Sequence, residues 1–143
     1  MTSVYFKATI LLVFLNSCSN NDANTDIKKL DHIAESYYQQ ENYDEAFKAY
    51  DSLLKVDSLN PKYYFNRGRC EMILLMLDDS RKDFLKSIEL GYRKADAYYN
   101  IGVTYIYEND SLVKKYFQEC LRVDPNHYEA NFMMNNLKLE EVQ

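Results

Sequence analysis

The chain has 143 residues, of which 47% are hydrophobic and 27% charged, and it contains only 3 Gly and 2 Pro. This length fits one domain, and the scarcity of Gly and Pro excludes a sandwich or barrel with frequent turns, so we expect an all-α protein. The formal net charge is -5 and Lys and Arg are not clustered, which argues against nucleic acid as a partner.

The N-terminus has the pattern of a signal for export. One Lys precedes the apolar run of residues 8–15, which is shorter than the about 20 residues that a transmembrane helix needs. The run ends at Leu15-Asn16-Ser17-Cys18, which resembles the lipobox of bacterial lipoproteins. The resemblance implies that residues 1–17 are a cleaved signal peptide and that Cys18 becomes a lipidated N-terminus. The polar residues 18–26 would then form a flexible tether.

The location of such a lipoprotein also follows from the resemblance. Ser19 stands where many inner-membrane lipoproteins have Asp, so we expect an anchor in the bacterial cell envelope, with the outer membrane preferred. The alternative is a soluble, non-anchored protein in which Cys18 has no lipid.

Residues of like kind recur every 34 positions in the remaining chain, which indicates an internal repeat. The repeated positions hold small residues at Ala34, Gly68 and Gly102, and aromatic residues at Tyr50, Phe84 and Phe117. The spacing from Phe84 to Phe117 is one residue shorter than the spacing from Tyr50 to Phe84. The third unit therefore lacks one residue, which we place in the turn at Asn109-Asp110.

This period and these small residues resemble the tetratricopeptide repeat, a helix-turn-helix unit. The resemblance implies a right-handed α-solenoid of three units, residues 27–60, 61–94 and 95–126, followed by a capping helix over residues 127–143. Gly68 and Gly102 are predicted to let paired helices approach closely, and Gly91 to form a left-handed helix cap. The second unit departs from the family at Arg67, a usually apolar site, and at Glu71, a usually aromatic one.

The resemblance also implies a concave groove that binds a protein or peptide partner. An excess of apolar and aromatic residues at its exposed positions favours a bound peptide or helix, although each residue could instead pack against a neighbouring helix. The candidate partner-binding residues are Tyr38, Phe65, Asn66, Arg69, Met72, Tyr99, Asn100, Val103 and Tyr107.

One known activity of the family is not expected. Members that clamp the C-terminal carboxylate of chaperones use Lys, Arg and Asn at defined sites, of which only Asn66 is present here. Acids stand nearby at Asp31, Glu35 and Asp96, and they would repel a carboxylate.

The sequence carries no recognisable catalytic or metal site. His32 and His127 are far apart in sequence and are predicted to be surface or lightly packed residues. Cys70 and Cys120 are predicted to be buried free thiols on helices that do not meet. We therefore expect no catalysis, no cofactor, no metal and no small-molecule substrate, and we interpret the chain as a membrane-anchored interaction adaptor. The alternative is a soluble interaction or chaperone-like module.

Overall fold

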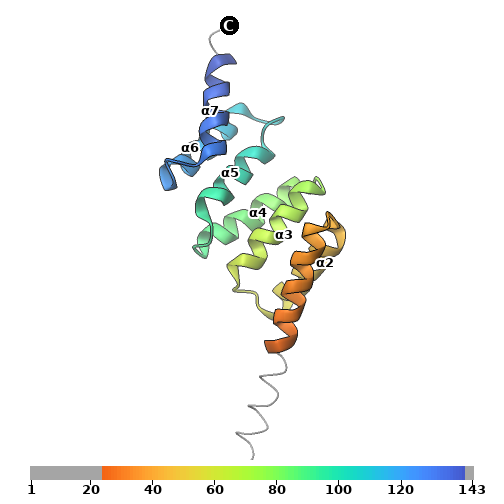
Figure 1. The fold of residues 1–143 in the computed structure, drawn as a ribbon. Helices are drawn as coiled ribbons and strands as arrows, with labels where there is room; N and C mark the ends of the chain where they lie inside the picture. The colour runs from red at the N-terminus through yellow and green to blue at the C-terminus, as the bar shows by residue number, and fades with distance from the viewer. Residues whose placement is uncertain (1–23, 141–143) are drawn as a thin grey trace, which may run out of the picture.

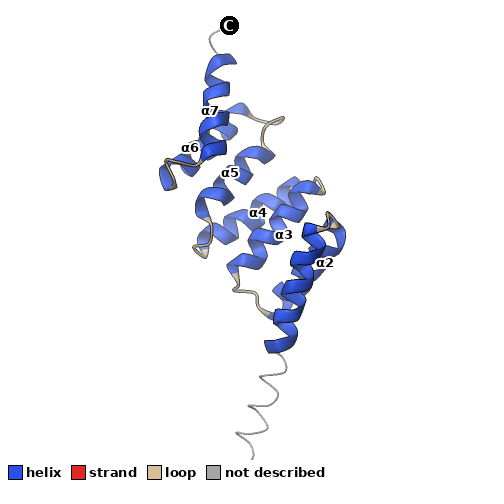
Figure 2. Ribbon diagram, viewed as in Figure 1, coloured by secondary structure: helices blue, strands red, loops and turns tan. Residues whose placement is uncertain are grey.

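A computed structural model describes residues 24–140 of the protein, with side chains described as far as residue 137. The described part contains helices joined by short loops and turns and has no strand (Figure 2). The helices are residues 24–39, α2 (Tyr43–Val56), α3 (Pro61–Ile73), α4 (Leu77–Glu89), α5 (Lys94–Thr104), α6 (Asp110–Val123) and α7 (Tyr128–Glu140). Residues 24–26, which the sequence assigned to the tether, belong to the first helix. The predicted signal peptide and Cys18 lie outside the described residues.

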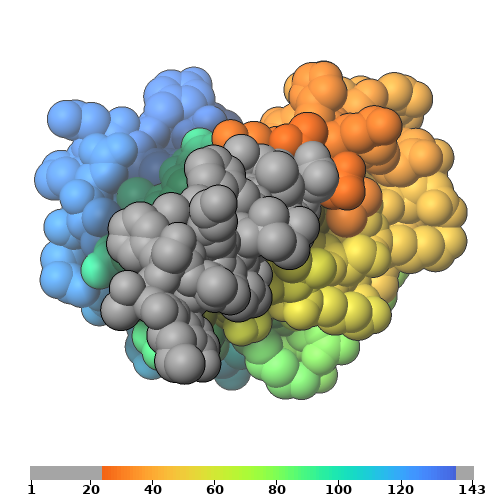
Figure 3. Space-filling model, turned by 90° about the horizontal axis from the view of Figure 1, so that it is seen from below, coloured from red at the N-terminus to blue at the C-terminus, as the bar shows by residue number. Residues whose placement is uncertain are grey.

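The helices stack in chain order into one array. From α2 to α7, each helix packs against the next one, and α3 also contacts α5 (Figure 1). Seen from below, from the N-terminal end, successive helices pass clockwise from orange through yellow and green to blue as they recede (Figure 3). This direction is that of a right-handed superhelix. The predicted all-α, right-handed α-solenoid with a C-terminal capping helix is confirmed.

Small residues bring the paired helices close together, as predicted. A Cβ atom added to Gly68 on α3 would lie 3.2 Å from Phe84 Cε1 on α4. A Cβ atom added to Gly102 on α5 would lie 2.6 Å from Phe117 Cε1 on α6. Each glycine thus provides the space that the aromatic ring of its partner helix fills.

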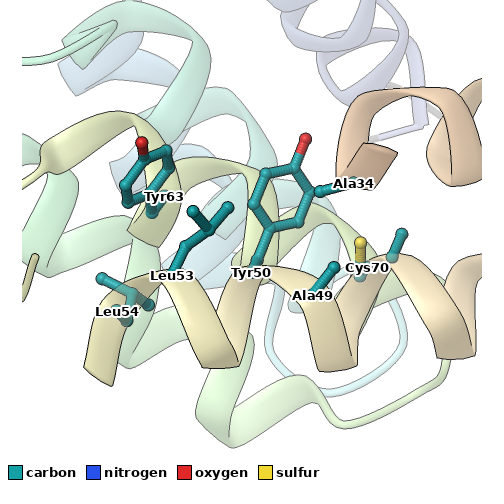
Figure 4. Close-up of a cluster of buried hydrophobic side chains, with 8 residues drawn as sticks. Ala34, Ala49, Tyr50, Leu53, Leu54, Tyr63 and Cys70 are labelled. Atoms are coloured by element: carbon teal, nitrogen blue, oxygen red, sulfur yellow. The ribbon is translucent and has the colours of Figure 1, made fainter. Parts of the chain in front are cut away.

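The first two units share one hydrophobic core (Figure 4). Tyr50 and Leu53 of α2 are almost completely buried, and they pack with Ala34 from the first helix and with Tyr63 and Cys70 from α3. Burying a large apolar side chain contributes about 1.5–3 kcal/mol, so this cluster is a main source of stability at the N-terminal end.

Three turns contain a residue with a left-handed backbone conformation. They are the turn after α4 and the turns that follow the first helix of the first unit and of the second unit. Gly91 has φ +86°, and the Tyr92 N–H donates to the Ser87 carbonyl at 3.0 Å, which confirms the predicted cap. Glu41 and Leu75 have φ values of 60° and 62° in the corresponding turns of the first and second units. These two positions adopt a conformation that favours glycine.

The third unit is shorter than the others. Helix α4 starts at Leu77, one full period after the start of α2 at Tyr43. Helix α6 starts at Asp110, which is one residue short of a full period after Leu77. Helix α5 ends early, at Thr104, and the turns of residues 105–108 lead to Asn109, whose side chain accepts a hydrogen bond from the Leu112 N–H at 3.1 Å. The missing residue therefore lies in the turn of residues 105–108, just before the predicted place at Asn109-Asp110, because Asn109 caps α6 and Asp110 is its first residue.

Arg67 and Glu71, the two departures from the family pattern, lie in an ion cluster between α2, α3 and α4. Arg67 donates to both carboxylate oxygens of Asp83, at 2.7 and 3.0 Å, and to Asp51 at 2.8 Å. Glu71 Oε2 is buried and has no hydrogen-bond partner among the described residues. Burial, together with the neighbouring charge of Asp83, raises the pKa of Glu71 to about 8. Arg67 thus links three helices by charge where an apolar side chain is usual.

The capping helix α7 is fixed at its start by His127. The His127 side chain is buried, and its Nδ1 accepts a hydrogen bond from the Ala130 N–H at 3.3 Å. The prediction of a surface or lightly packed histidine is therefore wrong for His127, because the first turn of α7 needs an acceptor there. His32 is exposed. Cys70 and Cys120 are buried free thiols, as predicted.

Candidate functional site

A cavity of about 220 Å³ opens on the side of the array formed by α3 and α5. Polar and charged side chains predominate among the residues that line it, which are Phe65, Arg69, Arg93, Asp96, Tyr99, Asn100, His127 and Glu129. Helix α3 supplies two of them, α5 supplies three, and the others come from the loops before α5 and α7 and from the first turn of α7. The second unit, the third unit and the capping helix therefore build this site together.

The floor of the cavity belongs to the hydrophobic core. The Phe65 ring is only 2% exposed and packs edge-on against Phe84, with ring centroids 5.6 Å apart, and against Tyr92 at 5.8 Å. The guanidinium of Arg93 covers this ring at 5.1 Å from its centroid. Phe65 is therefore a core residue at the base of the cavity, which corrects the prediction that it is an exposed contact residue.

Asn66 is the second correction among the candidate residues. Its side chain is buried, and Nδ2 donates a hydrogen bond to the Tyr50 hydroxyl at 3.2 Å. The Asn66 amide thus satisfies a polar group inside the core between α2 and α3, and it does not face the groove.

Tyr99 forms an aromatic wall of the cavity. Its ring stacks on Phe117, with centroids 5.4 Å apart, and makes a tilted contact with the His127 ring, with centroids 5.1 Å apart. Burial raises the pKa of the Tyr99 hydroxyl. The contact between Tyr99 and His127 joins α5 to the start of the capping helix.

Arg69 is the unusual cation of the site. Its guanidinium carbon lies 4.1 Å from the centroid of the Tyr38 ring, and no carboxylate of the described residues lies within ion-pair distance. The other four arginines all have acidic partners. These pairs are Arg67 with Asp83, Arg81 with Glu108, Arg93 with Asp96, and Arg122 with Glu119.

The acids near the groove are largely paired with cations. Lys62 Nζ lies 2.8 Å from an Asp31 carboxylate oxygen and 3.8 Å from one of Glu35. Arg93 Nε lies 3.0 Å from an Asp96 carboxylate oxygen. The sequence predicted that these acids would repel a carboxylate, but their pairing with Lys62 and Arg93 weakens that repulsion.

The remaining candidate residues occupy different parts of this side. Asn100 lines the cavity, and its side-chain amide makes no hydrogen bond with the described residues. Met72 and Val103 are partly buried and lie one turn further along α3 and α5 than Arg69 and Asn100. Tyr107 is fully exposed in the turn after α5 and does not line the cavity.

Sequence reasoning missed part of the site. Arg93, His127 and Glu129 were not candidates, because the family pattern places binding residues on the first helix of each unit. No sequence signal marked Arg93, because its direction depends on a left-handed backbone, with φ 41°, that the sequence alone does not reveal. Asp96 was identified as an acid near the groove but not as part of the site.

No group of three or more His, Cys, Asp or Glu side chains in residues 24–137 is arranged to hold a metal ion. Burial raises the pKa values of the Cys70 and Cys120 thiols to about 12, which leaves both groups protonated and poorly nucleophilic. Within the described chain, no helix is long and apolar enough to cross a membrane.

Two segments of the sequence match models of known repeats. Residues 30–57 and residues 95–127 each match a model described as a tetratricopeptide repeat. No curated protein sequence matches the chain. The chain therefore contains tetratricopeptide repeats, at the places where the period of the sequence locates its first and third units.

Solved structures share the fold at low sequence identity. The first tetratricopeptide domain of Spaghetti (RPAP3), bound to the HSP90 peptide SRMEEVD, has a TM-score of 0.72 at 22% identity, over 82% of this chain and 94% of that chain. The Yersinia enterocolitica type III secretion chaperone SycD, in complex with a peptide of the translocator YopD, has a TM-score of 0.72 at 14% identity, over 80% and 93% of the two chains. The Arabidopsis OM64 domain has a TM-score of 0.69 at 19% identity, over 80% and 95%.

Proposed function

We propose that this protein is a lipid-anchored tetratricopeptide adaptor of the bacterial cell envelope that binds a segment of a partner protein on the side formed by α3 and α5. The observation that carries this proposal is the cavity between α3, α5 and the start of α7, which presents unpaired polar groups on an otherwise well-packed array. Two structures of the same fold hold peptides, one from HSP90 and one from the translocator YopD.

We propose that this role is non-catalytic, and the chemistry of the described side chains supports the proposal. The two thiols in this part of the chain are buried and protonated, and the buried His127 ring is used to cap α7. The cavity is also smaller than the about 300–1,000 Å³ typical of sites for small molecules, and it fits a side chain of a larger ligand better.

The anchor rests on the residue pattern at Leu15-Asn16-Ser17-Cys18. Lipid chains on Cys18 would hold the array at a membrane, preferably the outer membrane, while the polar residues that follow separate it from the surface. In this arrangement the groove stays accessible to a partner near the membrane.

Membrane fractionation with metabolic labelling by an alkyne-bearing fatty acid tests the anchor. The wild-type protein should carry the label and sediment with membranes, whereas Cys18→Ala should lose the label and become soluble or remain uncleaved. Ser19→Ala is the matched control, because it alters the adjacent residue but leaves the attachment atom in place. Equal labelling and fractionation of wild type and Cys18→Ala would leave the soluble module as the correct interpretation.

In-cell crosslinking followed by mass spectrometry tests the groove. Asn100→Arg places a long side chain in the cavity and should abolish crosslinks to the partner. Leu85→Arg on α4 is the control, since Leu85 is exposed and lies outside the cavity. Partners that persist with Asn100→Arg and disappear with Leu85→Arg would contradict a binding site in this groove.

A further inference from the structure

The cavity contains one cation whose charge the described protein leaves without an acidic partner. Arg69 lines the cavity, whereas the four other arginines of the chain are each paired with a carboxylate at 2.6–3.0 Å. A guanidinium presents N–H donors in a planar fork that matches the two oxygens of a carboxylate. Arg69 therefore has the capacity to form an ion pair that the fold itself does not use.

The position of Arg69 is fixed before any ligand arrives. The guanidinium carbon of Arg69 lies over the Tyr38 ring, 4.1 Å from its centroid, and Tyr38 is in turn packed edge-on against Tyr43, with centroids 5.3 Å apart. A guanidinium has five N–H donors and the contact with the Tyr38 ring cancels none of its charge, so Arg69 keeps donors for a carboxylate. A preorganised cation loses less side-chain entropy when it binds its partner.

The other polar groups of the cavity favour a ligand with a single negative charge. Asn100 supplies an amide without a hydrogen bond to the described residues, and Arg93 is already neutralised by Asp96 at 3.0 Å. A phosphate dianion would need a second available cation, and Glu129, which also lines the cavity, would repel its two charges more strongly than the single charge of a carboxylate. One carboxylate matches the single positive charge of Arg69 and is repelled less by these acids than a dianion.

The surface next to the cavity defines the neighbouring residue of the ligand. Met72 follows Arg69 by one helical turn on α3, and Val103 follows Asn100 by one turn on α5, and both are partly exposed. One helical turn is about 5.4 Å, which is within reach of the next side chain of a peptide. The site thus places an apolar surface beside a carboxylate-binding cavity.

We infer that the cavity selects an acidic residue of the partner segment, whose carboxylate pairs with Arg69 and the Asn100 amide while an adjacent apolar residue packs on Met72 and Val103. This inference rests on the proposed function, since it names the chemistry that the groove recognises. It differs from capture of a chain terminus, because a side-chain carboxylate within a peptide suffices.

Selection of phage-displayed random peptides on the folded protein tests this inference. Wild type should enrich peptides with Asp or Glu beside an apolar residue, and Arg69→Gln should select peptides without this acidic position. Arg122→Gln is the matched control, because Arg122 is exposed on α6 and away from the cavity. Thermal unfolding of each variant verifies that the array remains folded.

Fluorescence anisotropy of a selected peptide then measures the contribution of the carboxylate. Exchanging its acidic residue for the corresponding amide should weaken binding about 10-fold for wild type and Arg122→Gln, but less than about 2-fold for Arg69→Gln. Selected peptides without an acidic position, or an equal loss with Arg69→Gln, would overturn the role of Arg69 and leave peptide binding intact.

Two other results also decide the question. A phosphoserine peptide that binds wild type more tightly than the acidic peptide would overturn the preference for a carboxylate. Failure of wild type to enrich any peptide would overturn the proposed function and this inference with it.

Discussion

The ring of Phe117 packs directly against Gly102, so closely that a methyl group at position 102 would lie 2.6 Å from Phe117 Cε1 and 2.7 Å from Cδ1. Phe117 is completely buried and cannot turn away without opening the core between α5 and α6. We therefore expect Gly102→Ala to lower the free energy of unfolding by about 1–3 kcal/mol, as measured by urea denaturation.

Gly68 provides the internal comparison. A methyl group there would meet Phe84 only at 3.2 Å, and alanine has a helix propensity about 1 kcal/mol better than glycine, which offsets mild crowding. Gly68→Ala should therefore remain close to the wild type in stability. A larger loss for Gly68→Ala than for Gly102→Ala would show that the two helix crossings are packed differently from this structure.

Stability should depend on pH through Glu71. Burial raises its pKa from the ordinary value of 4.5 to about 8, so the folded state binds more protons than the unfolded state between these values. The free energy of unfolding should consequently fall as the pH rises from about 4.5 to about 8. Urea denaturation at a series of pH values measures this slope.

Glu71→Gln is the variant that isolates this effect, because it keeps the shape of the side chain and cannot ionise. The slope over this pH window should flatten in Glu71→Gln and remain in Glu129→Gln, where the altered acid is exposed. An unchanged slope in Glu71→Gln would mean that another group is responsible.

Leu75 is strained and exposed at the same time. It has φ 62° in the turn between α3 and α4, and 79% of its surface is accessible. Since a left-handed conformation costs an L-residue roughly 1–2 kcal/mol, we expect Leu75→Gly to stabilise the protein by about 1 kcal/mol after the loss of chain entropy. Leu75→Ala keeps the strain and should leave the melting temperature almost unchanged, and equal effects of both variants would argue against strain.

The two described cysteines should be unreactive in the folded protein. Both side chains have 0% exposure, and burial raises their pKa values to about 12. A thiol-specific chromogenic reagent should modify Cys70 and Cys120 only in denaturant, with a rate that follows unfolding. Rapid modification of either thiol under native conditions would contradict the packing of these helices.

The sequence predicted those features that depend on the spacing of residues along the chain. The recurrence of Ala34, Gly68 and Gly102 located the helix crossings, and Gly91 located a cap, because these positions depend on local geometry and on the repeat. The shortened third turn was predicted for the same reason.

The features that depend on tertiary contacts could not be predicted in this way. Phe65 and Asn66 occupy family positions that usually face the groove, but here they complete the core around Phe84 and Tyr50. Arg93 and His127 reach the cavity from loops whose direction is set by left-handed backbone and by the cap of α7. The charges around Arg67 replace apolar packing with ion pairs to α2 and α4, and no repeat pattern encodes this exchange.

Site-specific photocrosslinking in the native cell shows directly whether the side formed by α3 and α5 binds a partner protein. A photoreactive phenylalanine analogue replaces Glu129, which lines the cavity with a 60% exposed side chain, or Leu85, which lies outside it. We expect one discrete crosslinked partner from position 129 and none from position 85. A partner captured from position 85 but not from position 129 would contradict binding on this side.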